Sequence, residues 1–416
     1  MIINHTQKTN RLLIIGWGWP EPDATAAGTR MLQLLSFFKK YSYEITFVST
    51  AIKNHHSKYL EELGIETEQV FLNCDSFDEF INSLQPSIVL FDRFLAEEQF
   101  GWRVAKQIPT ALRILDTEDL HSLRHVREQC FKANLPFSIP TWLGDDKTKR
   151  EIASIYRCDI SLIISEYEID VLSTVLGTNK NLLCHLPFML SASDVLSDAP
   201  SFDDRNDFMF IGGGKHTPNI DAIKYLKHKL WPQIRKKLPK SKLKIYGAYL
   251  PQQILELHNV SNGFYVLGKV AHVQDVMKSA RVCLVPLRFG AGIKGKLLHA
   301  MQFGTPSVTT KIGAEGMHGK MEWNGSIAEN EADFINSAVY LYTNKRAWFN
   351  AQENGYKLIS SLYNKDIQEN KLNARIDTII HDLEIHRNQN FIGSLLLHQT
   401  MASTKYMSRW IQEKNK

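Results

Sequence analysis

Cysteine is scarce in this sequence, and its spacing argues against two classes of protein. The 416 residues include five cysteines, an odd number, and no two of them stand at the Cys-x-x-Cys spacing. An odd and low count argues against a disulfide-stapled scaffold, and the missing Cys-x-x-Cys spacing argues against a structural zinc site, so we expect neither. We interpret the five as buried thiols of a protein that stays in a reducing cytoplasm.

Long hydrophobic runs are also missing. No run approaches the about 18 apolar residues that a membrane-spanning helix needs. The first apolar run, Leu12–Ile15, is short and follows Lys8 and Arg11, so we interpret it as a first strand rather than a signal peptide. We therefore expect a cytoplasmic protein that is soluble or at most peripheral at the inner face of a membrane.

Charge of one sign is not in large excess. The formal net charge is +5, which suits an anionic ligand or a membrane surface without requiring either. Nucleic-acid binders usually carry a dense stripe of Lys and Arg with interleaved aromatic residues, and we find no such stripe. We predict no nucleic-acid partner.

The length of 416 residues indicates two domains.

The first half of the chain alternates strand and helix patterns. The expected strands are Arg11–Gly16, Glu44–Ser49, Ser87–Phe91, Ala111–Leu115 and Asp159–Ser165, with helices at Ala27–Tyr41, Glu98–Gln107 and Lys147–Cys158. Repeated β-α-β units predict a parallel sheet covered by helices on both faces. We assign residues 1–190 to this Rossmann-like domain and 191–207, rich in Ser, Asp and Pro, to a linker.

A second alternation fills residues 208–365. Its expected strands are Phe208–Ile211, Leu243–Tyr246, Phe264–Leu267, Val282–Pro286 and Pro306–Thr310, with helices starting at Pro218, Pro251, Val273 and Lys296. The fold class is therefore α/β, with two doubly wound domains facing a cleft. Residues 366–416 are predicted to be helices that pack back on the first domain. Within them, 391–416 form an amphipathic helix that either packs there or contacts a membrane or partner.

The segment Gly290–Lys296 follows a strand and opens a helix. Exposed N–H groups, the helix dipole and two lysines together favour an anion, and glycines let a phosphate approach the backbone. A turn needed only for tight packing explains the same pattern, so both interpretations stay open. The spacing also resembles a P-loop, but Leu297 stands where a hydroxyl should hold Mg²⁺.

Four further loops carry candidate site residues. Gly212-Gly213-Gly214-Lys215-His216 follows the first strand of the second domain, and the turn ending at Gly28 is its counterpart in the first. His121 follows Asp116-Thr117-Glu118-Asp119-Leu120 past a strand end, where it is either an acid, base or donor, or a solvated loop residue. Glu315 either accepts bonds from sugar hydroxyls or is an ordinary turn residue.

Taken together, these segments resemble a known family. The ordered set Phe210-Ile211-Gly212, Pro286-Leu287, Gly290–Lys296, Ala300-Met301, Gly304-Thr305-Pro306 and Gly313–Gly316 is similar to the donor domain of family 4 glycosyltransferases, which have the GT-B fold. Pro20 to Arg30 resembles the opening of their acceptor domain. The run Leu115–Arg124 resembles a motif of a bacterial subgroup.

The resemblance implies a retaining, metal-independent transfer of a sugar from a nucleotide-sugar donor, without a cofactor. It assigns His121 to the reacting sugar, Lys296 to the diphosphate and His299 to the ribose. Glu315 would lie near the sugar or ribose, and Gly28 would let its loop approach the diphosphate. The full set of predicted donor-binding residues is Gly28, Gly213, Gly214, Lys215, Arg288, Gly292, Lys294, Gly295, Lys296, His299 and Glu315.

The sequence departs from the family pattern at two pairs of positions. The usual two glutamates are replaced by Ala291 and His299, and the usual basic pair would fall near Gly213 and Asn219. Lys215, Arg288 or Lys294 would then compensate. Two other functions stay open: a non-catalytic scaffold that binds a nucleotide or a partner glycosyltransferase, and a nucleotide-sugar epimerase. Glycan, lipid-linked and protein acceptors are all compatible with the sequence.

Overall fold

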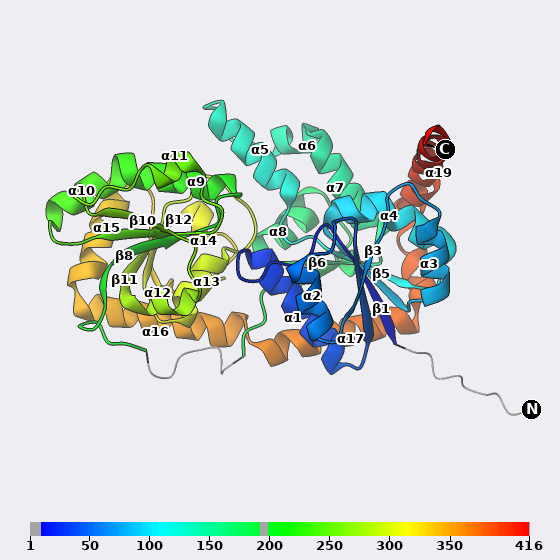
Figure 1. Ribbon diagram of the computed structural model, residues 1–416, viewed down its shortest axis with the longest axis horizontal. Helices are drawn as coiled ribbons and strands as arrows, with labels where there is room; N and C mark the ends of the chain where they lie inside the picture. The colour runs from blue at the N-terminus through cyan, green and yellow to red at the C-terminus, as the bar shows by residue number, and fades with distance from the viewer. Residues whose placement is uncertain (1–9, 192–198, 416) are drawn as a thin grey trace, which may run out of the picture.

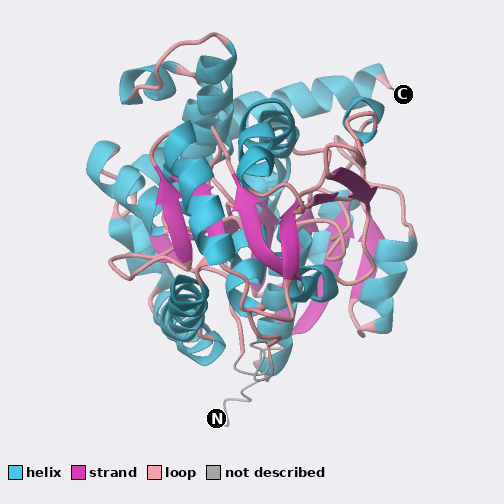
Figure 2. Cartoon of the chain, turned by 90° about the vertical axis from the view of Figure 1, so that its left-hand side faces the viewer, coloured by secondary structure: helices cyan, strands magenta, loops and turns pink. Residues whose placement is uncertain are grey.

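The computed structural model describes residues 10–191 and 199–415, and part of the predicted linker, 192–198, lies outside these ranges. Two sheets stand side by side in Figure 1, and the end-on view of Figure 2 shows strands between layers of helices. One sheet has seven strands and the other has six, and every strand pair in both is parallel. The two predicted doubly wound sheets are confirmed.

The N-terminal sheet has the strand order β3-β2-β1-β4-β5-β6-β7. Its strands are β1 (Arg11–Gly16), β2 (Glu44–Ser49), β3 (Glu66–Gln69), β4 (Ile88–Asp92), β5 (Leu112–Asp116), β6 (Ile160–Ile163) and β7 (Leu183–His185). The helices among them are α1 (Ala26–Lys40), α2 (His55–Glu62), α3 (Ser76–Leu84), α4 (Arg93–Gln107), α5 (His121–Lys132), α6 (Ile139–Gly144), α7 (Asp146–Arg157) and α8 (Glu166–Asp170). Central strands such as β4 are buried along their whole length, as expected when helices cover both faces.

The C-terminal sheet has the order β10-β9-β8-β11-β12-β13. Its strands are β8 (Asn206–Ile211), β9 (Leu243–Tyr246), β10 (Phe264–Gly268), β11 (Ala280–Val285), β12 (Ser307–Thr310) and β13 (Gly325–Ala328). Its helices are α9 (Thr217–Tyr225), α10 (Trp231–Lys237), α11 (Gln252–Leu255), α12 (Val273–Ser279), α13 (Gly295–Gln302), α14 (Lys311–Ala314), α15 (Glu331–Thr343) and α16 (Lys345–Leu362).

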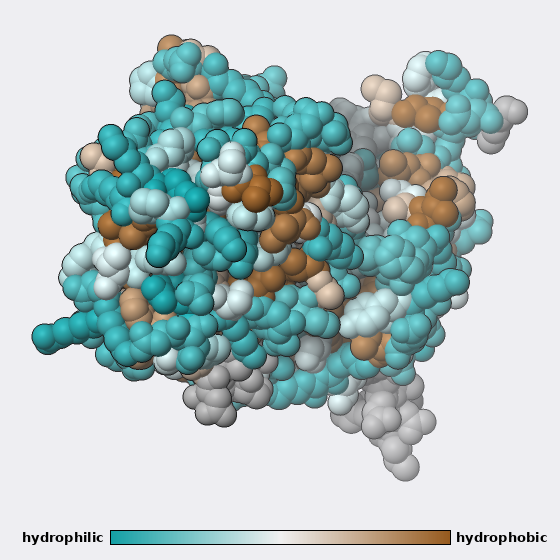
Figure 3. Space-filling view, turned by 60° about the vertical axis from the view of Figure 1, so that its left-hand side comes forward, coloured by the Kyte–Doolittle hydropathy of each residue, from teal (hydrophilic) through white to brown (hydrophobic). Residues whose placement is uncertain are grey.

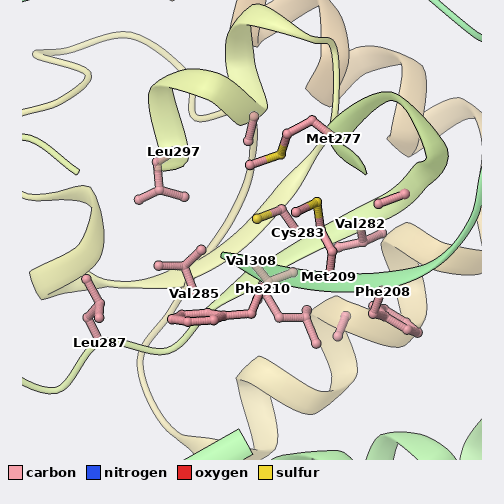
Figure 4. Close-up of a cluster of buried hydrophobic side chains, with 14 of the residues drawn as sticks. Phe208, Met209, Phe210, Met277, Val282, Cys283, Val285, Leu287, Leu297 and Val308 are labelled. Carbon is pink, nitrogen blue, oxygen red and sulfur yellow. The ribbon is translucent and has the colours of Figure 1, made fainter. Parts of the chain in front are cut away.

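The core of the C-terminal sheet supports the start of α13. Figure 4 shows Leu297 of α13 above side chains of β11, among them Val285 and Cys283. Leu297, Val285 and Cys283 are fully buried. Burying a side chain such as that of Leu297 or Val285 stabilises the fold by about 1.5–3 kcal/mol. A helix as short as α13 is not stable alone, so this packing holds it in place.

The last helices return to the N-terminal domain. They are α17 (Lys365–His381), α18 (Leu383–Asn388) and α19 (Phe391–Lys414). Leu372 and Ile376 of α17 join the buried cluster that contains Leu12 and Ile14 of β1. The long helix α19 contacts α7 and α4.

The outward face of α19 remains apolar and exposed, with Phe391 75% and Trp410 59% accessible. The helix is thus packed on one side and open on the other. Within the described residues, no helix is both long enough and apolar enough to cross a membrane.

Three strands escaped the sequence prediction. β3 reads Glu-Thr-Glu-Gln and lies at the sheet edge, so it lacks an apolar pattern. β7 has three residues, and β13 begins with a glycine, so neither gives the apolar run that identified the other strands.

Candidate active site

The loop between β11 and α13 is shaped by glycine. Gly292 has φ 62°, a left-handed conformation that favours glycine. A Cβ on Gly292 would lie 2.6 Å from Cβ of Asp119, and a Cβ on Gly295 would lie 3.0 Å from Cβ of Ala26. Both neighbours belong to the N-terminal domain. The predicted anion loop therefore lies against the opposite domain, at the carboxyl ends of both sets of strands.

Of the two lysines of this loop, Lys294 is buried and Lys296 is half-buried. Lys294 Nζ donates to the carbonyl of Gly292 at 2.7 Å, and Lys296 Nζ donates to Oδ1 of Asn219. Burial lowers the pKa of Lys294 to about 8 and that of Lys296 to about 7. An anion brought to this loop would restore their charge.

Asn219 joins the anion loop to the glycine turn after β8. Its amide donates to the carbonyl of Gly213 at 2.9 Å while its oxygen accepts from Lys296. Any side chain on Gly212 would collide with Asn219, and one on Gly214 would collide with the backbone of Tyr249. The structure therefore gathers Gly213, Gly214 and Lys296. Asn219, near which the family resemblance places a basic residue, holds that lysine through its side-chain oxygen.

The other two candidate cations have separate partners. Lys215 is exposed, lies 3.8 Å above the ring centroid of Tyr249, and has Glu21 at 3.9 Å. Arg288 forms a two-pronged pair with Asp221, at 2.9 and 2.6 Å, and its guanidinium lies between the rings of Phe131 and Tyr225. These contacts make Arg288 a link between α5 and α9 and leave less of it available to a diphosphate.

Gly28 is needed for its own turn. A Cβ there would collide with Glu21 and Pro22, and its N–H donates to Oγ1 of the helix cap Thr25 at 3.0 Å. That Gly28 lets its loop approach a diphosphate stays a prediction. The contact that the structure shows for this helix start is the one between Ala26 and Gly295.

His121 is the first residue of α5, where two N–H groups are capped by a carboxylate. Glu151 Oε1 accepts from the N–H of His121 and Oε2 from that of Ser122, both at 2.9 Å. The imidazole Nε2 lies 3.3 Å from Oδ1 of Asp119. Burial lowers the pKa of His121 to about 3, so the ring is neutral near pH 7 and can exchange hydrogen bonds with a hydroxyl.

Glu168 of α8 bridges the two domains. Its Oε1 accepts from the N–H of Leu120 at 2.9 Å and from that of Gly292 at 3.0 Å. Burial, with the nearby charge of Asp119, raises the pKa of Glu168 to about 8. One side chain thus fixes the segment before His121 against the anion loop.

Glu315 is engaged by an arginine that the sequence analysis missed. Arg127 Nη1 donates to Oε1 at 2.7 Å and Nη2 to Oε2 at 2.9 Å, and Nη1 also donates to the carbonyl of Gly290 at 2.8 Å. The available signal was its place on the helix that His121 opens, three residues after Arg124. Glu315 therefore contacts the opposite domain through Arg127.

His299 lies three residues after Lys296 on α13, with its ring centroid 6.1 Å from that of Phe303. Burial lowers its pKa to about 4, so this imidazole is also neutral near pH 7. Ala291, at the other missing glutamate position, is buried and packs with apolar residues of the N-terminal domain.

An acidic group lies behind this site, at the ends of β4 and β5. Arg30 Nη2 pairs with Asp116 Oδ1 at 2.8 Å, and Arg30 Nη1 also donates to the carbonyl of Leu186 at 2.7 Å. Asp92 and Glu118 are buried close by, and burial raises the pKa of both. This end of the N-terminal sheet is built from carboxylates and arginines.

The sequence profile of the family described as Glycosyl transferases group 1 matches residues 205–344. This range contains β8 to α15, including the anion loop. No curated protein matches the chain. The similarity to the donor domain of glycosyltransferases, first seen in the motifs, is confirmed for this part of the chain.

Solved structures with a similar fold extend over both domains. Sucrose-phosphate synthase from Thermosynechococcus elongatus has a TM-score of 0.69 at 14% identity, covering 90% of this chain and 100% of that chain. HepE from Anabaena, in complex with UDP and glucose, has a TM-score of 0.66 at 13% identity, covering 88% and 99%. A glycosyltransferase from Rickettsia africae scores 0.62 at 11% identity, covering 92% and 98%. These likenesses confirm the predicted GT-B fold.

Proposed function

We propose that this chain, a glycosyltransferase of the GT-B fold, transfers a sugar from a nucleotide-sugar donor to a hydroxyl group of an acceptor. One observation carries the proposal. The buried Lys294, the half-buried Lys296 and the first turn of α13 gather at a glycine loop that lies against the opposite domain. Such a loop suits the diphosphate of a donor held between the domains.

The same groups would stabilise the leaving diphosphate. Charge grows on its oxygens as the sugar bond breaks, and fixed cations and helix N–H groups lower the energy of that state. We propose that Lys294, Lys296 and α13 do this without a divalent metal. Within residues 10–191 and 199–415, no group of three His, Cys, Asp or Glu side chains is placed to hold a metal ion.

His121 would contact the sugar. Its ring is neutral and lies beside Asp119, which is packed against Gly292. A neutral imidazole at this point can donate to or accept from a sugar hydroxyl, and it orients the ring without adding a charge. We further propose that the product keeps the anomeric configuration of the donor, which NMR of the anomeric proton would test.

For the nucleotide, we propose UDP as the first choice, because a structural neighbour is known in complex with UDP and with UDP-glucose. His299 would face the ribose. The test is turnover, or slow hydrolysis, of UDP-, GDP- and ADP-sugars by the purified chain with a panel of acceptors. Release of one nucleoside diphosphate supports the proposal, and no release from any donor contradicts it.

A second candidate is a scaffold that binds a nucleotide or a partner glycosyltransferase without catalysis. Two observations favour it: His299 replaces the usual glutamate, and Glu315 is already paired with Arg127. The variant His299→Glu separates the two. A large gain in turnover indicates a decayed enzyme, whereas a loss indicates a site adapted to histidine.

We propose that the reaction takes place in the cytoplasm, on a glycan, lipid-linked or protein acceptor. The exposed apolar face of α19 carries Arg409 beside Trp410 and would let the protein lie on a membrane. Co-sedimentation with vesicles tests this. The double variant Phe391→Ser/Trp410→Ser should lower the bound fraction, because both side chains point away from the protein and contribute little to folding.

A further inference from the structure

The basic residues of this chain are concentrated in one short segment. Residues 222–255 contain nine Lys and Arg side chains and no Asp or Glu. The rest of the chain has 40 basic and 44 acidic residues, so it is net negative. The nine are spread over helices, a loop and a strand, and they therefore form no continuous stripe in the sequence.

Folding brings four of these lysines around one hollow. It has a volume of about 800 Å³, and Lys237, Lys240, Lys242 and Lys244 line it together with Asn206, Asp207, Leu238, Pro239, Ser241 and Tyr342. Lys240 and Lys242 are exposed. Asp207 is the only carboxylate among these lining residues, and it accepts from Lys244 Nζ at 3.2 Å and from the N–H of Lys242 at 3.0 Å. Positive charge in the hollow is thus only partly balanced.

The framework of the hollow is fixed. Asp207 has φ 64°, an uncommon conformation for a residue other than glycine, and it holds the start of β8 against the start of β9. Lys237 Nζ donates to Asn336 Oδ1 of α15 at 2.7 Å. The ring of Tyr342 is stacked on Phe208 with centroids 4.6 Å apart. These contacts define a lining rather than a set of independent surface lysines.

The hollow lies far from the candidate active site. It is formed at the starts of β8 and β9, whereas the glycine turn and anion loop follow the ends of β8 and β11. A strand of six residues spans about 20 Å. In Figure 1, α10, whose last residue lines the hollow, is at the outer end of the C-terminal domain, and Figure 3 shows this side as hydrophilic over much of its area, with hydrophobic residues gathered near the middle of the view. A donor in the cleft would not reach it.

We propose that this hollow is a second anion site, for a ligand that carries two or more phosphate groups. Lysine presents a compact charge on a flexible stem and binds phosphate as a point charge, while arginine is preferred for planar, two-pronged recognition. The lining contains four lysines and no arginine. Its volume admits several phosphate groups, either of a soluble molecule or of lipid headgroups. The ring of Tyr342 is stacked on Phe208 and its centroid also lies 4.7 Å from the guanidinium carbon of Arg281, so it is already engaged within the protein rather than free to stack on a nucleic-acid base.

The test uses inorganic tripolyphosphate and vesicles with and without phosphatidylglycerol. The variant Lys240→Gln/Lys242→Gln removes two charges from the hollow. The matched control Lys229→Gln/Lys236→Gln removes two charges from exposed lysines of the same segment that do not line it. Calorimetry gives the affinity for tripolyphosphate. Because the cleft lysines also attract phosphate, hydrogen exchange measured on individual peptides is needed to locate where tripolyphosphate binds.

We expect protection of peptides covering 237–244 and a loss of affinity at this site on the order of tenfold in the hollow variant, with little change in the control. If only vesicles protect 237–244, and the hollow variant reduces that effect, the phosphate groups are those of lipids. No protection of 237–244 by either probe overturns the proposal. An equal loss of affinity in both variants overturns the proposal as well, because it would show that only the overall positive charge of residues 222–255 attracts the ligand.

Discussion

The two sheets reach the cleft with opposite electrostatic character. The C-terminal sheet ends in glycine loops with the buried Lys294 and the half-buried Lys296, and desolvation lowers the pKa values of both lysines. The N-terminal sheet ends in carboxylates, and burial raises the pKa values of Glu151 and Glu168 to about 7 and about 8. The difference suggests a division of work. The strand ends of the C-terminal sheet (the C-terminal edge of the cleft) supply charge for a diphosphate. The strand ends of the N-terminal sheet (the N-terminal edge of the cleft) position backbone N–H groups and His121.

The largest effect is expected from removing a cation of the C-terminal edge. Lys296→Met keeps the length and apolar stem of the side chain but leaves the diphosphate with one less charge. We expect kcat/KM for a donor sugar to fall about 100- to 1000-fold, as when one group that stabilises a developing anion is lost. Lys311→Met is the matched control. Lys311 is exposed and paired with Glu329, so a comparable loss there would contradict the assignment.

A smaller effect is expected from breaking the contact between the edges. Arg127→Ala leaves Glu315 unpaired, with 15% of its side chain accessible, and removes the bond to Gly290. We expect a roughly tenfold loss of kcat/KM and a stability loss of about 2–3 kcal/mol. The double variant Arg127→Ala/Glu315→Ala should be more stable than Arg127→Ala alone, measured by urea unfolding. A double variant that is less stable would show that the pair is not coupled in this way.

The pH dependence of donor binding separates the edges further. In the free protein Lys296 loses its proton near pH 7 and Lys294 near pH 8, while a bound diphosphate favours the charged lysines. Binding should therefore take up protons, and affinity should fall between pH 7 and 9 by up to about tenfold per pH unit for each lysine. Calorimetry in buffers of different ionisation enthalpy measures the uptake. Proton release on binding would contradict this account.

The smallest effect is expected from Glu168→Gln. Glu168 has a folded pKa of about 8 against an ordinary value of 4.5, so between these pH values the folded state holds a proton that the unfolded state has lost. The free energy of unfolding therefore falls as pH rises through this range, and the variant should remove that contribution. Near pH 8 we expect the variant to be more stable than the wild type, and this difference should shrink as the pH falls towards 4.5. The exposed neighbour Glu166→Gln should leave the pH dependence unchanged.

The fold and the anion loop could be predicted from the sequence because both depend on local patterns. Apolar strands gave ten of the thirteen strands, and the ordered glycines and lysines from Gly290 gave the loop. Contacts between the domains could not be predicted. Arg127 and Glu315 are 188 residues apart in the chain, and Glu168 and Gly292 are 124 apart. Such pairs become visible only when the two sheets face each other.

Arg288 shows a second limit of prediction from the sequence, because it was predicted to bind the diphosphate but is engaged elsewhere. Its position after β11 made it a candidate for the diphosphate, but folding brings Asp221, Phe131 and Tyr225 around it. A basic residue beside an anion loop is equally suited to an ion pair, and sequence alone does not distinguish the two.

The most direct test of the division between the edges is nucleotide binding by calorimetry. UDP, GDP and ADP would each be titrated into the wild-type chain and into Lys294→Met/Lys296→Met, with circular dichroism confirming that the variant is folded. We predict that at least one nucleotide, UDP first, binds the wild type and binds the variant at least about 100-fold more weakly. Binding of no nucleotide, or equal binding by a folded variant, would contradict the central claim.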